Sequence, residues 1–314
     1  MTTTLTAGLE RLDAIAMERG LVIQADAPLA PLTTLRVGGP ADRLAAPESV
    51  DGLVSLVEAA LDAAVPYFIL GKGSDLVVAD RGIPGLVIRP RADGVVVDGT
   101  RLRAEAGASM TGLAKRCARE ALAGFDWAIS IPGSFGGAIW ANAGAHEGEM
   151  AQVVAEVEVF DPTDRGRKRL TADDCGFAYR DSRFKHGGEV ILVGEVALSG
   201  GDPIEISALV DQHQVRRRAT QPLADQNAGS VYRNPPGDHA GRLVEAAGLK
   251  GHRIGTAQVS PLHANFIVTD RGAGRASDVR ALGDHVRATV ADRFGVELEY
   301  EIAFVGDWGE GVER

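Results

Sequence analysis

The chain has 314 residues, of which 45% are hydrophobic and 24% are charged. This composition is typical of a globular protein, and the length predicts two or three domains of about 100–200 residues each. The formal net charge of −10 argues against a nucleic-acid partner, because the chain as a whole repels polyanions. Cys117 and Cys175 show no metal-binding spacing, so we expect free thiols in a reducing compartment.

The N-terminal residues lack the basic start and apolar core of a secretory signal. No later window approaches the ~18 consecutive apolar residues that a membrane-spanning helix needs. We therefore expect a cytoplasmic protein that does not insert into a membrane.

Hydrophobic periodicity and turn residues predict the elements in chain order. For the first 200 residues the prediction is helices over 5–19, 50–61 and 109–123, strands over 67–70, 76–78, 86–88, 153–160 and 190–198, and a hairpin of 95–97 with 102–106. Residues 29–40 are expected to form a loop that leads into a strand, and Ser109 is the expected N-cap of the third helix.

After residue 200 the pattern predicts helices over 204–218, 240–247 and 276–294 and strands over 264–268 and 296–305. Helices and strands alternate without the regular order of a doubly wound sheet. The sequence therefore predicts an α+β fold, with a new domain beginning near the helix over 204–218.

The glycine-rich segment, residues 131–145, contains four glycines and four alanines behind a proline. Small side chains leave the backbone uncovered, so this segment is suited to lie against a bulky ligand such as a cofactor. Close packing of a loop between helices is the alternative interpretation.

A second stretch of small residues, the Gly71 loop (residues 71–75), follows a short apolar run. It is neither a dinucleotide fingerprint nor a P-loop, because a strand follows it and the lysine and hydroxyl are in the wrong order. A turn between strands can still form a nest of backbone N–H groups for phosphate, and a tight hairpin is the alternative. Two such loops in one chain predict one large ligand.

Other polar residues are weaker signals when taken singly. Arg180 beside Tyr179 would suit a carboxylate, although a surface arginine is the commoner case. Ser230 does not lie in a nucleophile elbow, so a turn serine is the alternative interpretation there. His263 has no second histidine at ligand spacing, and no metal site is expected.

The last predicted strand alternates between apolar and acidic residues. A solvated acidic face explains this pattern, which cannot distinguish Glu301 from Glu297 and Glu299.

Taken together and in order, seven segments between about Leu32 and Gly306 resemble the UDP-N-acetylenolpyruvoylglucosamine reductase family, the MurB flavoenzymes of bacterial cell-wall synthesis. The resemblance is to the compact subtype of the family. It rests on residues 33–41, 71–76, 131–145, 179–184, 229–235, 260–266 and 301–306.

The resemblance implies an FAD-binding fold of the vanillyl-alcohol-oxidase (PCMH) type in two parts, residues 1–90 and 91–202, followed by an α+β substrate-binding domain, residues 203–314. It also implies non-covalent FAD that is reduced by NADPH. The reduced flavin then converts UDP-N-acetylenolpyruvoylglucosamine to UDP-N-acetylmuramate for peptidoglycan synthesis, and so serves cell shape and division. We expect a monomer.

Carried over position by position, the resemblance implies a catalytic trio of Arg180, Ser230 and Glu301. It places substrate contacts at Tyr179, Arg233, Asn234 and Gln258. It places FAD contacts at Gly71, Lys72, Gly73, Ser74, Asp75, Pro132, Gly133, Ser134, Gly136, Gly137, Ala138, Asn142, Gly144 and Ala145.

Three residues depart from the family pattern: Asp75 stands where asparagine is expected, His146 where tyrosine is expected, and Arg233 where lysine is expected. Two alternatives to the reductase are a flavin oxidase that uses oxygen and a nucleotide-sugar-binding protein without turnover. Nothing in the sequence resembles the usual histidine that binds flavin covalently, so the oxidase lacks support. The binding protein is disfavoured because the implied catalytic trio is complete.

Overall fold

The computed structural model describes residues 2–309, which form two compact units. Met1 and residues 310–314, the ends of the first and last predicted domains, lie outside the described residues. Unit 1 contains Arg43–Lys72, Gly85–Arg217 and the chain up to Ala25, and unit 2 contains Asp26–Asp42, Gly73–Pro84 and the chain from Arg218 onward. The chain passes repeatedly from one unit to the other, so these units do not test contiguous domains. The domains 1–90, 91–202 and 203–314 therefore stay a prediction.

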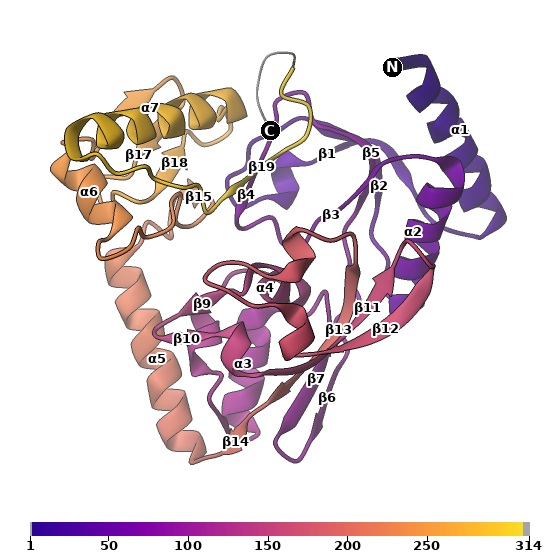
Figure 1. Ribbon diagram of the computed structural model, residues 1–314, viewed down its shortest axis with the longest axis horizontal. Coiled ribbons are helices and arrows are strands. Elements are labelled where there is room, and N and C mark those ends of the chain that lie inside the picture. Colours follow the sequence, from indigo (N-terminus) through magenta and orange to yellow (C-terminus); the bar gives the residue numbers. More distant parts are fainter. Residues whose placement is uncertain (1, 310–314) are drawn as a thin grey trace. The chain divides into compact units, whose positions relative to one another are not determined.

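A five-stranded antiparallel sheet dominates unit 1 (Figure 1). Its strands, in spatial order, are β12 (Gly166–Thr171), β11 (Val154–Asp161), β13 (Val190–Ala197), β7 (Arg101–Glu105) and β6 (Val95–Asp98). Helices α3 (Met110–Arg119) and α4 (Phe135–Ala141) contribute apolar residues to the core that includes strands β7, β11 and β13. The predicted hairpin is confirmed as β6–β7.

A second core of unit 1 lies around helices α1 (Thr2–Glu18) and α2 (Val50–Ala63). Ser49 begins α2 by accepting a hydrogen bond from Gly52 N–H, as an N-cap residue does. A four-stranded sheet has the order β1 (Gln24–Pro28), β2 (Pro40–Ala45), β5 (Ile83–Ile88), β3 (Tyr67–Ile69). Its strands β3 and β5 pair in parallel.

Smaller elements complete unit 1: two-stranded sheets of β8 (Leu122–Ala123) with β14 (Ser199–Gly200) and of β9 (Gly144–Ala145) with β10 (Gly148–Glu149), and the long helix α5 (Pro203–Thr220). Helix α5 confirms the predicted helix over 204–218.

Unit 2 contains a four-stranded sheet in the order β15 (Gln226–Asn227), β18 (Ile267–Thr269), β17 (Ala257–Val259), β16 (Arg253–Ile254). Helices α6 (Ala240–Ala246) and α7 (Ala276–Phe294) pack their apolar faces into the same core. A separate parallel pair joins β4 (Leu76–Val78) to β19 (Ala303–Val305). Helices α6 and α7 lie where the periodicity predicts them.

Several predicted boundaries are wrong. The glycine-rich segment contains helix α4, and α3 ends at Arg119 rather than at 123. Ser109 is the N-cap residue of α3, but its hydroxyl contacts Thr111 and makes no capping bond. Strand β18 begins at 267 rather than at 264, and the last strand covers only Ala303–Val305. The hairpin interpretation of the Gly71 loop is also wrong, because β3 and β4 belong to different sheets.

Candidate active site

In unit 1, the Arg180 segment (residues 179–184) packs against the glycine-rich segment. The hydroxyl of Ser182 donates to the carbonyl of Trp140 at 2.6 Å, and Trp140 Nε1 donates to the carbonyl of Phe184 at 3.0 Å. Two motifs about 40 residues apart therefore form one body. The aromatic Trp140 within a run of small residues was a signal for this contact that the sequence analysis did not use.

Arg180 lies in a tight turn that directs its guanidinium onto the glycine-rich segment. Its backbone has a φ of +55°, a left-handed conformation that is strained for a residue with a side chain. Nη2 of Arg180 donates to the carbonyl of Gly144 at 2.9 Å, and the guanidinium carbon lies 5.0 Å from the ring centroid of Tyr179. Lys185, which the sequence analysis did not single out, donates from Nζ to the Arg180 carbonyl at 2.8 Å.

Asn142 ties the glycine-rich segment to Ala178, the residue directly before the Arg180 segment. The side chain is fully buried, and the residue ends helix α4 with a left-handed φ of +43°. Its Nδ2 donates to the carbonyl of Ala178 at 2.8 Å, and its Oδ1 accepts from the N–H of Ala151 at 2.9 Å. The amide is thus used within the protein, and a contact between Asn142 and FAD stays a prediction.

Close packing explains part of the small-residue pattern. Phe135 N–H donates to the carbonyl of Ala108, Gly136 N–H donates to the carbonyl of Ala106, and Ser134 Oγ accepts from Gly137 N–H. The first turn of α4 is therefore satisfied by protein acceptors. A Cβ at Gly136 would lie 2.8 Å from the Cβ of Ala106, so only glycine fits there.

The first half of the Gly71 loop meets the glycine-rich segment. A Cβ at Gly71 would lie 2.6 Å from Ser134 Oγ, so the two small-residue stretches lie together as the sequence predicts for one shared ligand. Lys72 is half-buried, and this burial, together with the charge of Arg89, lowers the pKa of its ammonium group.

The second half of the loop belongs to unit 2. Gly73 has a φ of +62°, and its carbonyl accepts from the N–H of Thr34 at 2.9 Å. Within residues 2–309, the consecutive N–H groups of Lys72, Gly73 and Ser74 donate to no protein acceptor. Successive N–H groups around a left-handed residue form a concave anion site, which suits the diphosphate of a dinucleotide cofactor.

Also in unit 2, backbone pairing joins the segments that carry Ser230 and Glu301. The N–H of Glu301 donates to the carbonyl of Val231 at 2.8 Å, and Tyr232 forms an antiparallel bridge with Tyr300. The predicted serine and carboxylate therefore come from neighbouring segments although 70 positions separate them in sequence.

The structure also separates the three acidic residues of the last segment. Glu297 and Glu299 are exposed, whereas Glu301 is half-buried. A solvated face therefore accounts for two of the three, and Glu301 is the one held in the protein.

The second half of the Gly71 loop approaches the same segments of unit 2. Ala303 N–H donates to the carbonyl of Asp75 at 2.9 Å, just before β4 and β19 pair. A Cβ at Gly229 would lie 3.9 Å from the carbonyl oxygen of Ser74. Three predicted motifs thus meet within unit 2.

The predicted substrate residues of unit 2 have protein partners. Asn234 Oδ1 accepts from the N–H of Ala240 at 3.1 Å, and Gln258 Nε2 donates to the carbonyl of Gly251 at 3.0 Å. Arg233 lies 3.7 Å from a carboxylate oxygen of Glu299. Substrate contacts from these side chains stay a prediction.

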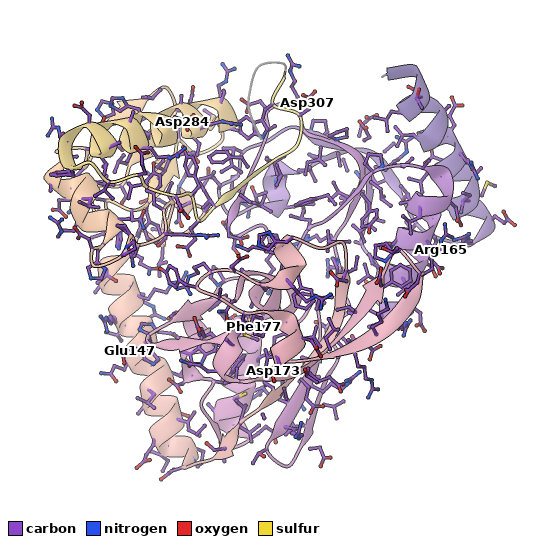
Figure 2. All side chains as sticks on the ribbon, in the orientation of Figure 1. Glu147, Arg165, Asp173, Phe177, Asp284 and Asp307 are labelled. Atoms are coloured by element: carbon purple, nitrogen blue, oxygen red, sulfur yellow. The ribbon has the colours of Figure 1, made fainter. Side chains whose placement is uncertain are left out.

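His146, which departs from the family pattern, is held in a histidine pair. Its Nε2 lies 2.8 Å from Ser130 Oγ, and its ring stacks on His213 of helix α5 with centroids 3.9 Å apart. Burial and the charges of His213 and Arg216 lower the pKa of His146. Figure 2 labels Glu147, the residue that follows His146.

Each unit thus collects part of the predicted site. Tyr179 and Arg180 lie with the glycine-rich segment in unit 1, and Ser230 and Glu301 lie with the second half of the Gly71 loop in unit 2. The convergence of all three trio residues stays a prediction. Within residues 2–309, no cluster of three His, Cys, Asp or Glu residues could hold a metal ion, and no helix is long and apolar enough to span a membrane.

Comparison with known protein families gives two matches along the chain. Residues 41–167 match an FAD binding domain, and residues 221–305 match the C-terminal domain of UDP-N-acetylenolpyruvoylglucosamine reductase. These matches confirm the predicted FAD-binding fold followed by a C-terminal domain, and the mixed helices and sheets of the structure confirm the α+β class. The oxidase alternative loses support, because the C-terminal match is to a reductase.

Comparison with whole proteins gives matches over nearly the full length of the chain. The chain is 46% identical over 302 residues to UDP-N-acetylenolpyruvoylglucosamine reductase 2 of Symbiobacterium thermophilum, covering 96% of both chains. It is 41% identical to the corresponding reductase of Myxococcus xanthus, covering 98% of this chain and 97% of the other. The crystal structure of the reductase from Thermus caldophilus matches with a TM-score of 0.77 and 33% identity, covering 90% of this chain and 98% of that one.

Proposed function

Because the chain belongs to the UDP-N-acetylenolpyruvoylglucosamine reductase family, we propose that it reduces UDP-N-acetylenolpyruvoylglucosamine to UDP-N-acetylmuramate with NADPH as reductant. The chain is an FAD flavoprotein of the oxidoreductase class. When bound, FAD would supply the hydride transfer between NADPH and the substrate. The proposal places a monomeric UDP-N-acetylmuramate dehydrogenase in the cytoplasm, in the synthesis of peptidoglycan precursors.

The Gly71 loop fits the diphosphate of FAD. Its three consecutive N–H groups without protein acceptors and the half-buried ammonium of Lys72 are donors of the right kind. The glycine-rich segment beside Gly71 would then lie along the rest of the cofactor. The carboxylate of Asp75 adds a negative charge near this loop, so we expect Asp75 to contribute its backbone rather than its side chain.

Arg180 would bind the carboxylate of the enolpyruvyl group. Hydride addition to the terminal carbon of the double bond leaves negative charge on the adjacent carbon and the carboxylate. A guanidinium beside that carboxylate stabilises this charge and lowers the barrier. The bond from Arg180 to Gly144 supports this role, because it holds the guanidinium on the segment assigned to FAD.

Ser230 would complete the reduction by giving a proton to the adjacent carbon, and Glu301 would hold or polarise the group opposite. The double bond then has gained one hydride and one proton. The observation that carries this assignment is the backbone pairing that brings the Ser230 and Glu301 segments together.

Replacement of Ser230 by alanine tests the proposal. We expect Ser230→Ala to keep FAD and to be reduced by NADPH at the parent rate, while reoxidation by the enolpyruvyl substrate slows by about 10²- to 10⁴-fold. Stopped-flow absorbance separates the two half-reactions. Ser207→Ala, which removes an exposed hydroxyl on α5, is the matched control. Reoxidation of Ser230→Ala at the parent rate would remove Ser230 from the mechanism.

A further inference from the structure

Helix α7 accepts hydrogen bonds from two tyrosines, one in each of the paired segments that carry the proposed catalytic residues. The hydroxyl of Tyr232 donates to the carbonyl of Gly283 at 2.8 Å, and that of Tyr300 donates to Asp284 Oδ1 at 2.8 Å. Gly283 and Asp284 are consecutive in α7, and Figure 2 labels Asp284 on this helix. One turn of one helix therefore fixes both segments.

Further contacts restrict the ring of Tyr300. It stacks on the ring of Tyr232 with centroids 5.4 Å apart, and the guanidinium carbon of Arg287 lies 5.0 Å from its centroid. Arg287 Nε also donates to the carbonyl of Leu298 at 2.8 Å. A Cβ at Gly283 would lie 2.5 Å from the Tyr300 hydroxyl, so glycine is required for this approach.

Both tyrosine hydroxyls act as hydrogen-bond donors at neutral pH. Tyr232 is 2% exposed, and burial raises the pKa of its hydroxyl well above the ordinary value. Burial and the carboxylate of Asp284 raise the pKa of Tyr300 in the same way. The two hydrogen bonds to α7 are therefore present throughout the physiological pH range.

These side-chain contacts matter because the backbone pairing between the two segments is short. Tyr232 and Tyr300 form an isolated bridge, and strand β19 begins only at Ala303. A short pairing fixes register weakly, so side chains that join both segments to one rigid helix supply the missing restraint.

We propose that Tyr300 and Asp284 are positioning residues, which hold Glu301 at a fixed place relative to Ser230 for the protonation step. The inference rests on the proposed roles of Ser230 and Glu301. Glu301 follows Tyr300 directly in the chain, and Ser230 lies two residues before Tyr232. A tilt of the Tyr300 ring would therefore move the carboxylate relative to the hydroxyl.

The test uses Tyr300→Phe, Asp284→Ala and Asp284→Asn in the FAD-loaded enzyme. We expect NADPH to reduce the flavin within about twofold of the parent rate in all three. Reoxidation by UDP-N-acetylenolpyruvoylglucosamine should slow by about 3- to 30-fold in Tyr300→Phe and Asp284→Ala. Asp284→Asn keeps an oxygen acceptor for the Tyr300 hydroxyl and should restore most of the rate.

Tyr67→Phe is the matched control, because it removes a half-buried hydroxyl from β3 in unit 1. If Ser230→Ala slows reoxidation while Tyr300→Phe and Asp284→Ala do not, the inference is overturned and the proposed function stands. If Ser230→Ala reoxidises at the parent rate, both fail. Equal slowing of the two half-reactions, or equal loss in Asp284→Asn and Asp284→Ala, would also overturn the inference.

Discussion

The structure predicts that Asn142 is a main support of the candidate site in unit 1. Replacing it with glycine leaves the carbonyl of Ala178 and the N–H of Ala151 without partners inside the protein. Ala151 is half-buried and Ala178 is exposed, so water can replace part of the lost bonding. At about 0.5–1.5 kcal/mol for each hydrogen bond, Asn142→Gly should lower the free energy of unfolding by about 1–3 kcal/mol. Asn142→Ala should cost about 1–2 kcal/mol more, because alanine is strained at a φ of +43°.

Urea denaturation followed by circular dichroism measures both effects, with the parent and the two variants compared at one temperature. The pair of variants separates the lost hydrogen bonds from the backbone strain. A glycine variant as stable as the parent would refute the role of the amide. If the alanine variant were as stable as the glycine variant, the argument that alanine is strained by the left-handed backbone at residue 142 would be refuted.

Two further predictions concern groups outside the candidate site. Burial raises the pKa of Cys117 to about 12 and that of Cys175 to about 11, so iodoacetamide at about pH 8 should label neither thiol before unfolding; rapid native labelling in intact mass spectra would contradict this. Asp80 accepts from the N–H groups of Ala276 and Ser277 at the start of α7, so Asp80→Ala should lower the free energy of unfolding by about 0.5–2 kcal/mol in urea. Burial alone would raise the pKa of the Asp80 carboxyl, but the hydrogen bonds from Ser277 and Ala276 lower it. The ionised carboxyl therefore stabilises the folded state above the ordinary carboxyl pKa, and this stabilisation is lost on acidification. A stability difference from the parent that is the same at about pH 7 and about pH 3 would contradict it.

Local pattern predicts the helices well where an apolar face repeats. Helix α7 begins and ends at the predicted residues, and α2 is found within two residues of its predicted end. Helix α4 was missed because glycine is a poor helix former. It forms because Ser134 caps it and because carbonyls from residues 106 and 108, distant in sequence, accept its first N–H groups.

The last segment shows the opposite error. Alternation of apolar and acidic residues predicted a strand over 296–305, but the chain finds a partner only at Tyr300 and from Ala303 onward. Period-two burial requires an extended chain and does not require a neighbouring strand.

The candidate site, too, was predicted only in part from the sequence. Small residues and unusual polar clusters marked the segments that meet in each unit. The contacts that hold them, such as those of Asn142 with Ala178 and Tyr300 with Asp284, join residues that no local pattern relates. They depend on tertiary packing, which a single sequence does not display.

The central claim is that this chain passes hydride from NADPH through FAD to the enolpyruvyl group of UDP-N-acetylenolpyruvoylglucosamine. An anaerobic absorbance titration tests it most directly. We expect NADPH to bleach the flavin absorbance band at about 450 nm. One equivalent of the substrate should then restore the band, with formation of UDP-N-acetylmuramate. A flavin that stays bleached after the substrate is added, or a purified protein without a flavin spectrum, would contradict the account.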